Sequence, residues 1–143
     1  MGSSQLQGTW KLHSSENFED YLKATTTGYD FCAAGRSTKD HDAKAELTIT
    51  EKDGEWTILM QKKGDRHELK FRIGEEFQEV NPVTGQGIQS IVTEEDGKLT
   101  QIQRGIGKNG EDATIVREID SNGKLLVTLS VGDVTARRIY TVA

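Results

Sequence analysis

Apolar and polar residues alternate along several short runs of the chain. The alternation is clear in ELTIT (46–50), WTILM (56–60) and ELKFRI (68–73). Successive side chains of a β-strand point to opposite faces, so this pattern predicts strands with one buried and one exposed face.

Glycine follows aspartate or asparagine between many of these runs. Asp53-Gly54 and Asp96-Gly97 are examples, and such pairs are typical of tight hairpin turns. Regularly spaced strands and turns indicate an up-and-down antiparallel sheet, and a sheet of ten twisted strands tends to close. We therefore predict an all-β, ten-stranded antiparallel up-and-down β-barrel. Its expected strands cover residues 6–14, 45–52, 55–62, 67–73, 76–81, 86–93, 98–105, 112–119, 124–131 and 134–142.

One stretch, residues 14–25, has a helical period instead. Phe18, Tyr21, Leu22 and Thr25 recur at positions i, i+3, i+4 and i+7, which lie on one face of a helix. The sequence therefore predicts a helix between the first and second strands.

Capping residues and a glycine suggest the limits of this helical region. Ser14 or Ser15 is expected to cap the first helix, and Gly28 is expected to end it before a second short helix near residues 29–36. Because a helix pair inserted here cannot join the sheet, we expect it to cover one open end of the barrel as a lid.

Composition narrows the class of protein. The 143 residues suit a single domain, residues 1–143, and 34% of them are hydrophobic. The formal charge of −5 argues against nucleic acid as a partner, since phosphate binding needs clustered basic residues. The chain shows no secretory signal, and its single cysteine, Cys32, suits a reducing compartment. We expect a cytoplasmic protein.

Residues that could perform catalysis or bind a metal are sparse. The sequence has no phosphate-binding glycine loop, no pair of histidines at metal-binding helical spacing and no nucleophile elbow. His41 lies between two aspartates in KDHDAK (39–44), which is better explained as a solvated loop. Cys32 has no neighbouring histidine in the sequence and is expected to be an inert thiol. We predict no catalytic residue, no metal site, no cofactor and no enzymatic activity.

Two predicted strands place arginines where either face could be the inner one. Arg117 shares a face with Ile115, and Arg138 shares a face with Tyr140, whereas Arg137 lies on the opposite face from Arg138. By pattern alone, arginines lying along the outer surface are slightly favoured. The alternative is that Arg117, Arg138 and Tyr140 converge inside the barrel, where two buried guanidinium groups would attract a ligand carboxylate.

Six segments in order along the chain resemble one known family, the intracellular lipid-binding proteins, whose members bind fatty acids or retinoids in the cytosol and belong to the calycin superfamily. The matching segments are GTWKLHSSENFEDYLK (8–23), FRIGEEFQE (71–79), SIVTEEDGKL (90–99), TIVREI (114–119), GKLLVTLSVGDV (123–134) and ARRIY (136–140). The resemblance implies a ten-stranded β-clam with a helix-turn-helix lid between strands one and two.

The resemblance also implies a ligand and its site. Family members that bind fatty acids hold the carboxylate with two arginines and a tyrosine, which correspond here to Arg117, Arg138 and Tyr140. Arg138 is then expected to point inward and Arg137 outward. The expected ligand is a long-chain fatty acid, with retinoic acid as the alternative. Residues expected to line the cavity or its portal are Phe18, Tyr21, Leu22, Tyr29, Leu69, Phe71, Ile115, Val127 and Leu129.

Some segments depart from the family pattern. The region 36–47 is longer than usual, and TTTGYDF (25–31) is more polar than the usual lid. Residues 15–36 hold four acidic and two basic residues, a net charge of −2, so we expect at most transient contact with anionic membranes. We expect a monomeric carrier for transport of its ligand. A β-barrel scaffold for protein interaction, without an endogenous ligand, is the alternative from another class.

Overall fold

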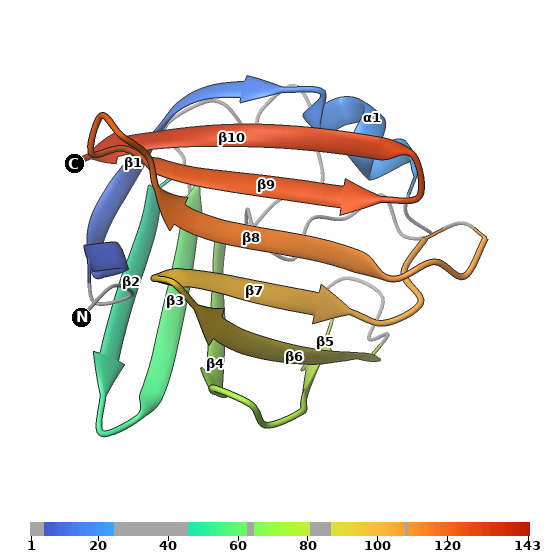
Figure 1. Ribbon diagram of the computed structural model, residues 1–143, viewed down its shortest axis with the longest axis horizontal. Coiled ribbons are helices and arrows are strands. Elements are labelled where there is room, and N and C mark those ends of the chain that lie inside the picture. Colours follow the sequence, from blue (N-terminus) through green and yellow to red (C-terminus); the bar gives the residue numbers. More distant parts are fainter. Residues whose placement is uncertain (1–4, 25–45, 63–64, 81–86, 108) are drawn as a thin grey trace.

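The computed structural model describes residues 5–24, 46–62, 65–80, 87–107 and 109–143. Its ten strands form one antiparallel sheet in the order β4-β3-β2-β1-β10-β9-β8-β7-β6-β5, which curls into a nearly closed barrel (Figure 1). The strands are β1 (Gly8–Glu16), β2 (Glu46–Lys52), β3 (Glu55–Lys62), β4 (Asp65–Arg72), β5 (Phe77–Val80), β6 (Gly87–Glu95), β7 (Lys98–Gln103), β8 (Ala113–Ile119), β9 (Leu125–Val131) and β10 (Val134–Val142). The predicted all-β barrel is confirmed, and every strand end falls within two residues of its predicted position.

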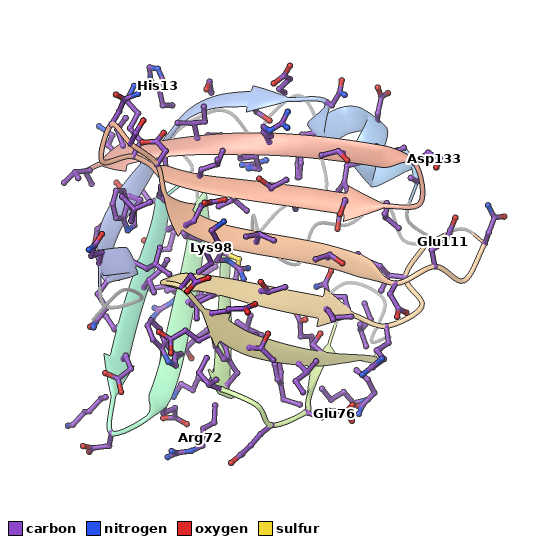
Figure 2. All side chains as sticks on the ribbon, viewed as in Figure 1. His13, Arg72, Glu76, Lys98, Glu111 and Asp133 are labelled. Atoms are coloured by element: carbon purple, nitrogen blue, oxygen red, sulfur yellow. The ribbon has the colours of Figure 1, made fainter. Side chains whose placement is uncertain are left out.

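Alternating burial along the strands follows the sequence pattern. In β9, Leu125, Val127, Leu129 and Val131 are buried and the residues between them are partly exposed. Charged side chains such as Arg72, Glu76 and Lys98 lie on the outside (Figure 2). The inner face of the sheet therefore forms the hydrophobic core.

Two of the predicted hairpin turns have the backbone that their sequences favour. Asp53 and Gly54 have φ angles of 54° and 88°, and Asp96 and Gly97 have φ angles of 54° and 81°. Positive φ at both central residues matches the right-handed twist of the strands that each turn joins, β2 to β3 and β6 to β7.

The barrel is not fully closed by backbone hydrogen bonds. β4 and β5 are the two edges of the sheet, and the described residues show no backbone pairing between them. Aromatic rings span the two edges instead: Phe71 of β4 stacks on Phe77 of β5 with 5.7 Å between ring centroids. Trp56 of β3 also stacks on Phe71, with 6.5 Å between ring centroids. Side-chain packing thus holds these edges together near the turn that joins them.

The first strand ends two residues later than the sequence pattern predicts, so the predicted helix cap is wrong. Ser14 and Ser15 belong to β1, in which a bulge between Leu12 and Ser14 shifts the register against β10. Beyond the bulge, Ser15 pairs with Arg138 and the strand continues to Glu16. Pairing with β10 therefore overrides the tendency of these serines to cap a helix.

Helix α1 (Phe18–Lys23) begins later and is shorter than predicted. Asn17, with a φ of 62°, turns the chain out of β1, and its carbonyl accepts the first helical hydrogen bond from the Tyr21 amide at 3.0 Å. Asparagine tolerates this left-handed backbone better than most residues. The helix packs on β10 (Figure 1). The second predicted helix, near 29–36, lies outside the described residues.

Trp10 illustrates how the core accommodates a polar atom. The side chain is 5% exposed, and its indole Nε1 donates a hydrogen bond to the Leu6 carbonyl at 3.0 Å. A buried indole usually needs such an acceptor.

No helix in the described part of the chain is long and apolar enough to cross a bilayer.

Candidate ligand-binding site

Both candidate arginines point into the barrel. Arg117 and Arg138 are each 1% exposed and Tyr140 is 3% exposed, whereas Arg137 is exposed. The prediction that Arg138 points inward and Arg137 outward is confirmed. The alternation of β10, which also buries Ala136, aims Arg138 and Tyr140 at the same interior.

Strand register brings the two arginines to the same level of the barrel. Arg117 on β8 and Arg138 on β10 both pair with Val127 of β9, which lies between these strands. Neighbouring strands are about 4.8 Å apart, so the two backbone positions are roughly 10 Å apart across β9. Two long inward side chains at that separation can converge on a group the size of a carboxylate.

The guanidinium of Arg138 is held by aromatic residues. Its Nε donates a hydrogen bond to the Tyr140 hydroxyl at 3.2 Å. Its Cζ lies 4.2 Å from the centroid of the Phe18 ring, at the start of α1, and 5.9 Å from the Tyr140 ring. Cation–π contacts of this kind stabilise a buried guanidinium. A tyrosine hydroxyl that accepts from Arg138 keeps its own proton for donation to a second acceptor.

Arg117 is connected to a second buried polar group, which was not predicted from the sequence. Its Nη1 donates to Gln101 Oε1 at 2.9 Å, and Gln101 Nε2 donates to Glu79 Oε2 at 2.7 Å. The same Glu79 oxygen accepts hydrogen bonds from Gln103 Nε2 at 3.1 Å and from the Ser90 hydroxyl. All four of these neighbours and Glu79 are buried, so a polar network crosses β5, β6, β7 and β8 inside the barrel.

Strand alternation could have revealed this network. Glu79 shares a strand face with Phe77, and Gln101 and Gln103 share a face with Leu99. An apolar neighbour two residues away marks the inner face, and a polar residue on that face is informative. Their side chains face the same interior as the two arginines.

Burial raises the pKa of Glu79 above its ordinary value of 4.5. The hydrogen bonds from Ser90 and Gln103, the charge of Arg117 and the hydrogen bond from Gln101 oppose that shift without cancelling it. Removal from water disfavours the ionised carboxylate, whereas donors and a positive charge favour it. The described interior therefore contains two guanidinium groups and one carboxyl group with a reduced tendency to ionise.

We expect the raised pKa of Glu79 to make stability pH-dependent. The folded protein keeps a proton on Glu79 at pH values where the unfolded chain has lost it. This contribution to stability is therefore complete below pH 4.5 and is lost as the pH rises through the folded pKa. Glu79→Gln imitates the protonated form and does not titrate. Chemical denaturation from pH 4 upward should show wild-type stability falling relative to the variant.

The matched control for this measurement is Glu76→Gln, which removes an exposed carboxylate on the loop before β5. The difference in unfolding free energy between wild type and Glu79→Gln should fall with pH more steeply than the corresponding difference for the control. Equal slopes for the two variants would contradict the assignment of a raised pKa to Glu79.

The predicted cavity-lining residues are mostly buried in the described structure. Seven of the nine are 4% exposed or less: Phe18, Tyr21, Leu69, Phe71, Ile115, Val127 and Leu129. Their role in lining a cavity stays a prediction. The side chain of Leu22 and the whole of Tyr29 lie outside the described part, as do Cys32 and His41.

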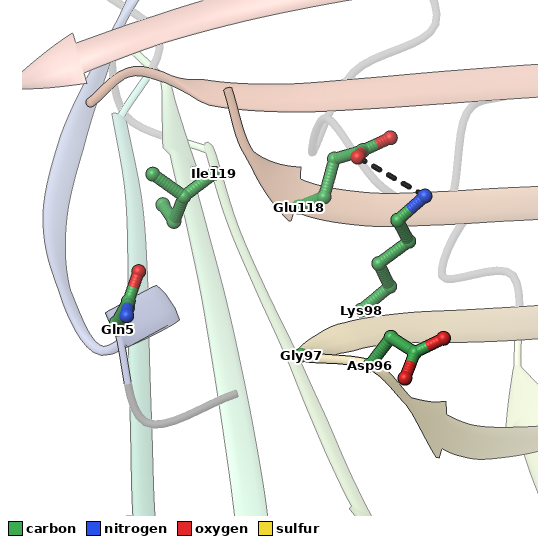
Figure 3. A pocket seen from close by; sticks show the side chains of 6 residues that line it. All are labelled: Gln5, Asp96, Gly97, Lys98, Glu118 and Ile119. Atoms are coloured by element: carbon green, nitrogen blue, oxygen red, sulfur yellow. Dashed lines mark ion pairs between the residues drawn. The ribbon is translucent and has the colours of Figure 1, made fainter. Parts of the chain in front are cut away.

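A hollow on the outer surface is distinct from this interior site. It is lined by Gln5, Asp96, Gly97, Lys98, Glu118 and Ile119 (Figure 3). Within it, Lys98 Nζ and Glu118 Oε1 form an ion pair at 3.4 Å, and both side chains are partly exposed. Exposed ion pairs contribute little, and the hollow has neither the depth of burial nor the arginine pair of the interior.

Fold and site together define a nearly closed antiparallel β-barrel with two arginines and a tyrosine on its inner face. The model of the lipocalin / cytosolic fatty-acid binding protein family matches residues 7–143. The chain belongs to this family, which confirms the resemblance seen in the sequence.

Individual relatives differ in what they are named for. Fatty acid-binding protein homolog 5 of Caenorhabditis elegans is 36% identical over 140 residues, 98% of each chain. The bilirubin-inducible fluorescent protein UnaG of Anguilla japonica is 37% identical over 137 residues, 93% of this chain and 92% of UnaG. A Schistosoma mansoni fatty acid binding protein, solved in complex with arachidonic acid, superposes with a TM-score of 0.77 at 28% identity, covering 100% of this chain and 99% of that one.

Proposed function

We propose that the protein is a carrier that binds one apolar carboxylate inside the barrel, with a long-chain fatty acid as the first candidate. The observation that carries this proposal is the shared register of Arg117 and Arg138 on Val127, with both guanidinium groups buried. Charge-assisted hydrogen bonds from these groups, together with the Tyr140 hydroxyl, would hold the carboxylate. Burial of the tail would add about 0.8 kcal/mol per methylene before entropic costs.

The relatives support an apolar carboxylate as the ligand but do not identify which acid is bound. One relative is named for fatty acids and a similarly distant one for bilirubin, a pigment that also carries carboxylates. Retinoic acid is the alternative that the sequence suggested. All three candidates share an ionised carboxyl group and a large apolar body, which is the chemistry that Arg117 and Arg138 would recognise.

We also propose that the carrier works without catalysis, as a monomer, in the cytoplasm. The sequence has no nucleophile elbow and no histidine pair at metal-binding helical spacing, and the single cysteine suits a reducing compartment. A carrier of this kind would solubilise its ligand and move it between membranes through the aqueous phase.

Native mass spectrometry followed by ligand titration tests the proposal. Delipidated protein would be titrated with oleate, retinoic acid and bilirubin, and we expect oleate to bind in a one-to-one complex. Tighter binding of one of the other two acids would keep the carrier function and change the ligand. Failure of all three to bind would overturn the proposal and favour the scaffold alternative.

A further inference from the structure

The two oxygens of the Glu79 carboxyl group have different surroundings. Oε2 accepts three of the four hydrogen bonds of the network, from Ser90, Gln101 and Gln103. Oε1 is also a buried atom, yet it has no hydrogen-bond partner anywhere in the part of the chain that the structure describes. One oxygen of this side chain thus joins strands together, and the other does not.

Buried polar atoms in folded proteins nearly always have a hydrogen-bond partner, so a buried acceptor without a donor needs an explanation. Leaving such a group unsatisfied costs about 1–3 kcal/mol, and more for a charged group. Linking β5, β6 and β7 requires only Oε2, so a strand-linking role does not account for a carboxyl group at this position. Oε1 would be satisfied if a hydrogen-bond donor reached it from inside the barrel.

The proposed carboxylate site lies close to the Glu79 carboxyl group. A single side-chain amide, that of Gln101, separates Glu79 from the guanidinium of Arg117, because it donates to one and accepts from the other. The side chains of Gln101 and Glu79 are 0% and 3% exposed, so the path between the two groups is inside the barrel. If the carboxylate of a ligand is bound at Arg117, the part of the ligand a few bonds further along its chain would come within reach of Glu79.

We propose that Glu79 Oε1 is a second ligand contact, which accepts a hydrogen bond from a hydroxyl or N–H group of the bound acid. The inference rests on the proposed function, since the arginines fix where the ligand begins. It assigns the barrel to apolar carboxylates that carry a hydrogen-bond donor along their length. A donor on Oε1 would also oppose the effect of burial on this carboxyl, as the donors on Oε2 already do.

Hydroxystearic acids with the hydroxyl at successive positions test the proposal against stearate. In wild type, at least one positional isomer should bind roughly tenfold more tightly than stearate, the effect of one added hydrogen bond. In Glu79→Gln the ratio of the two affinities should fall to near one. Glu76→Gln, which alters an exposed carboxylate, should keep the wild-type ratio.

The oxostearic acid with its ketone at the preferred position separates donation from acceptance. A ketone can only accept a hydrogen bond, so it should bind no tighter than stearate. Tighter binding of the oxo acid would show that Glu79 donates, and would overturn the proposal. Equal affinity of every hydroxy isomer and stearate in wild type, or an unchanged preference in Glu79→Gln, would overturn it as well.

Stearate itself distinguishes this inference from the proposed function. If stearate and all its derivatives fail to bind wild type, the arginine site is wrong. If stearate binds and no isomer is preferred, only the role of Glu79 is wrong. Should Glu79→Gln fail to fold, a crystal structure of wild type with the preferred isomer decides: a hydroxyl within hydrogen-bond distance of Oε1 supports the proposal, and a hydroxyl elsewhere overturns it.

Discussion

Replacing Arg138 by glutamine is expected to weaken oleate binding by roughly 30-fold or more. Removing one partner of a buried, hydrogen-bonded charge pair costs about 2–5 kcal/mol, and 1.4 kcal/mol corresponds to a tenfold change in Kd. Glutamine keeps a neutral donor but loses the charge and the forked geometry that suits a carboxylate. Isothermal titration of delipidated protein with oleate measures the change directly.

Arg137→Gln is the matched control, because it removes the same charge one residue away on the outer face of β10. We expect its affinity for oleate to stay within about twofold of wild type, since an exposed charge acts weakly through water. A comparable loss in both variants would mean that overall charge, and not the inward guanidinium, determines affinity. Unchanged affinity in Arg138→Gln would remove that residue from the site.

Replacing Phe71 by alanine is expected to lower the free energy of unfolding by about 3–5 kcal/mol. The side chain is 4% exposed and stacks with the rings of both Trp56 and Phe77. Its loss would remove two ring contacts at once, one of which connects the two edges of the sheet. Urea denaturation followed by tryptophan fluorescence would measure the change.

Lys70→Ala provides the comparison for Phe71→Ala, because Lys70 is the preceding residue of β4 and its side chain is exposed. We expect it to change stability by no more than about 0.5 kcal/mol. A cost below 1 kcal/mol for Phe71→Ala would show that the aromatic stack does not hold β4 and β5 together. Such a small cost would instead indicate that the Phe71 side chain is loosely packed and lines a cavity.

Most of the fold could be predicted because strand period and hairpin chemistry are local signals. The Asp-Gly turns identify where strands end, and alternation in runs such as ELTIT and LLVTLSV identifies the buried face. The helix start could not be predicted in this way. Ser14 and Ser15 are good capping residues, but the partners that keep them in β1 come from β10, more than a hundred residues away in the sequence.

The candidate site was predictable in part for a similar reason. Periodicity separated Arg137 from Arg138 but did not say which one faces inward, and the family resemblance supplied that choice. The shared register of Arg117 and Arg138 on Val127 needs the order of β8, β9 and β10, which no local pattern contains. Glu79 was missed because an acidic residue in a segment rich in glutamate suggests an exposed face until the strand alternation is applied.

The pairing of the first strand, β1, with the last, β10, in the interior of the sheet has a consequence for how the protein folds in a cell. β1 hydrogen-bonds to β2 on one side and to β10 on the other, and the Ala143 amide even donates to the Thr9 carbonyl at 3.0 Å. During synthesis the first strand is made early and its second partner is made last. The edge of β1 that pairs with β10 therefore stays unpaired until almost the whole chain has been translated. An unpaired strand edge can pair with the wrong strand. Nascent chains halted before β10 should therefore depend on chaperones that cover β1.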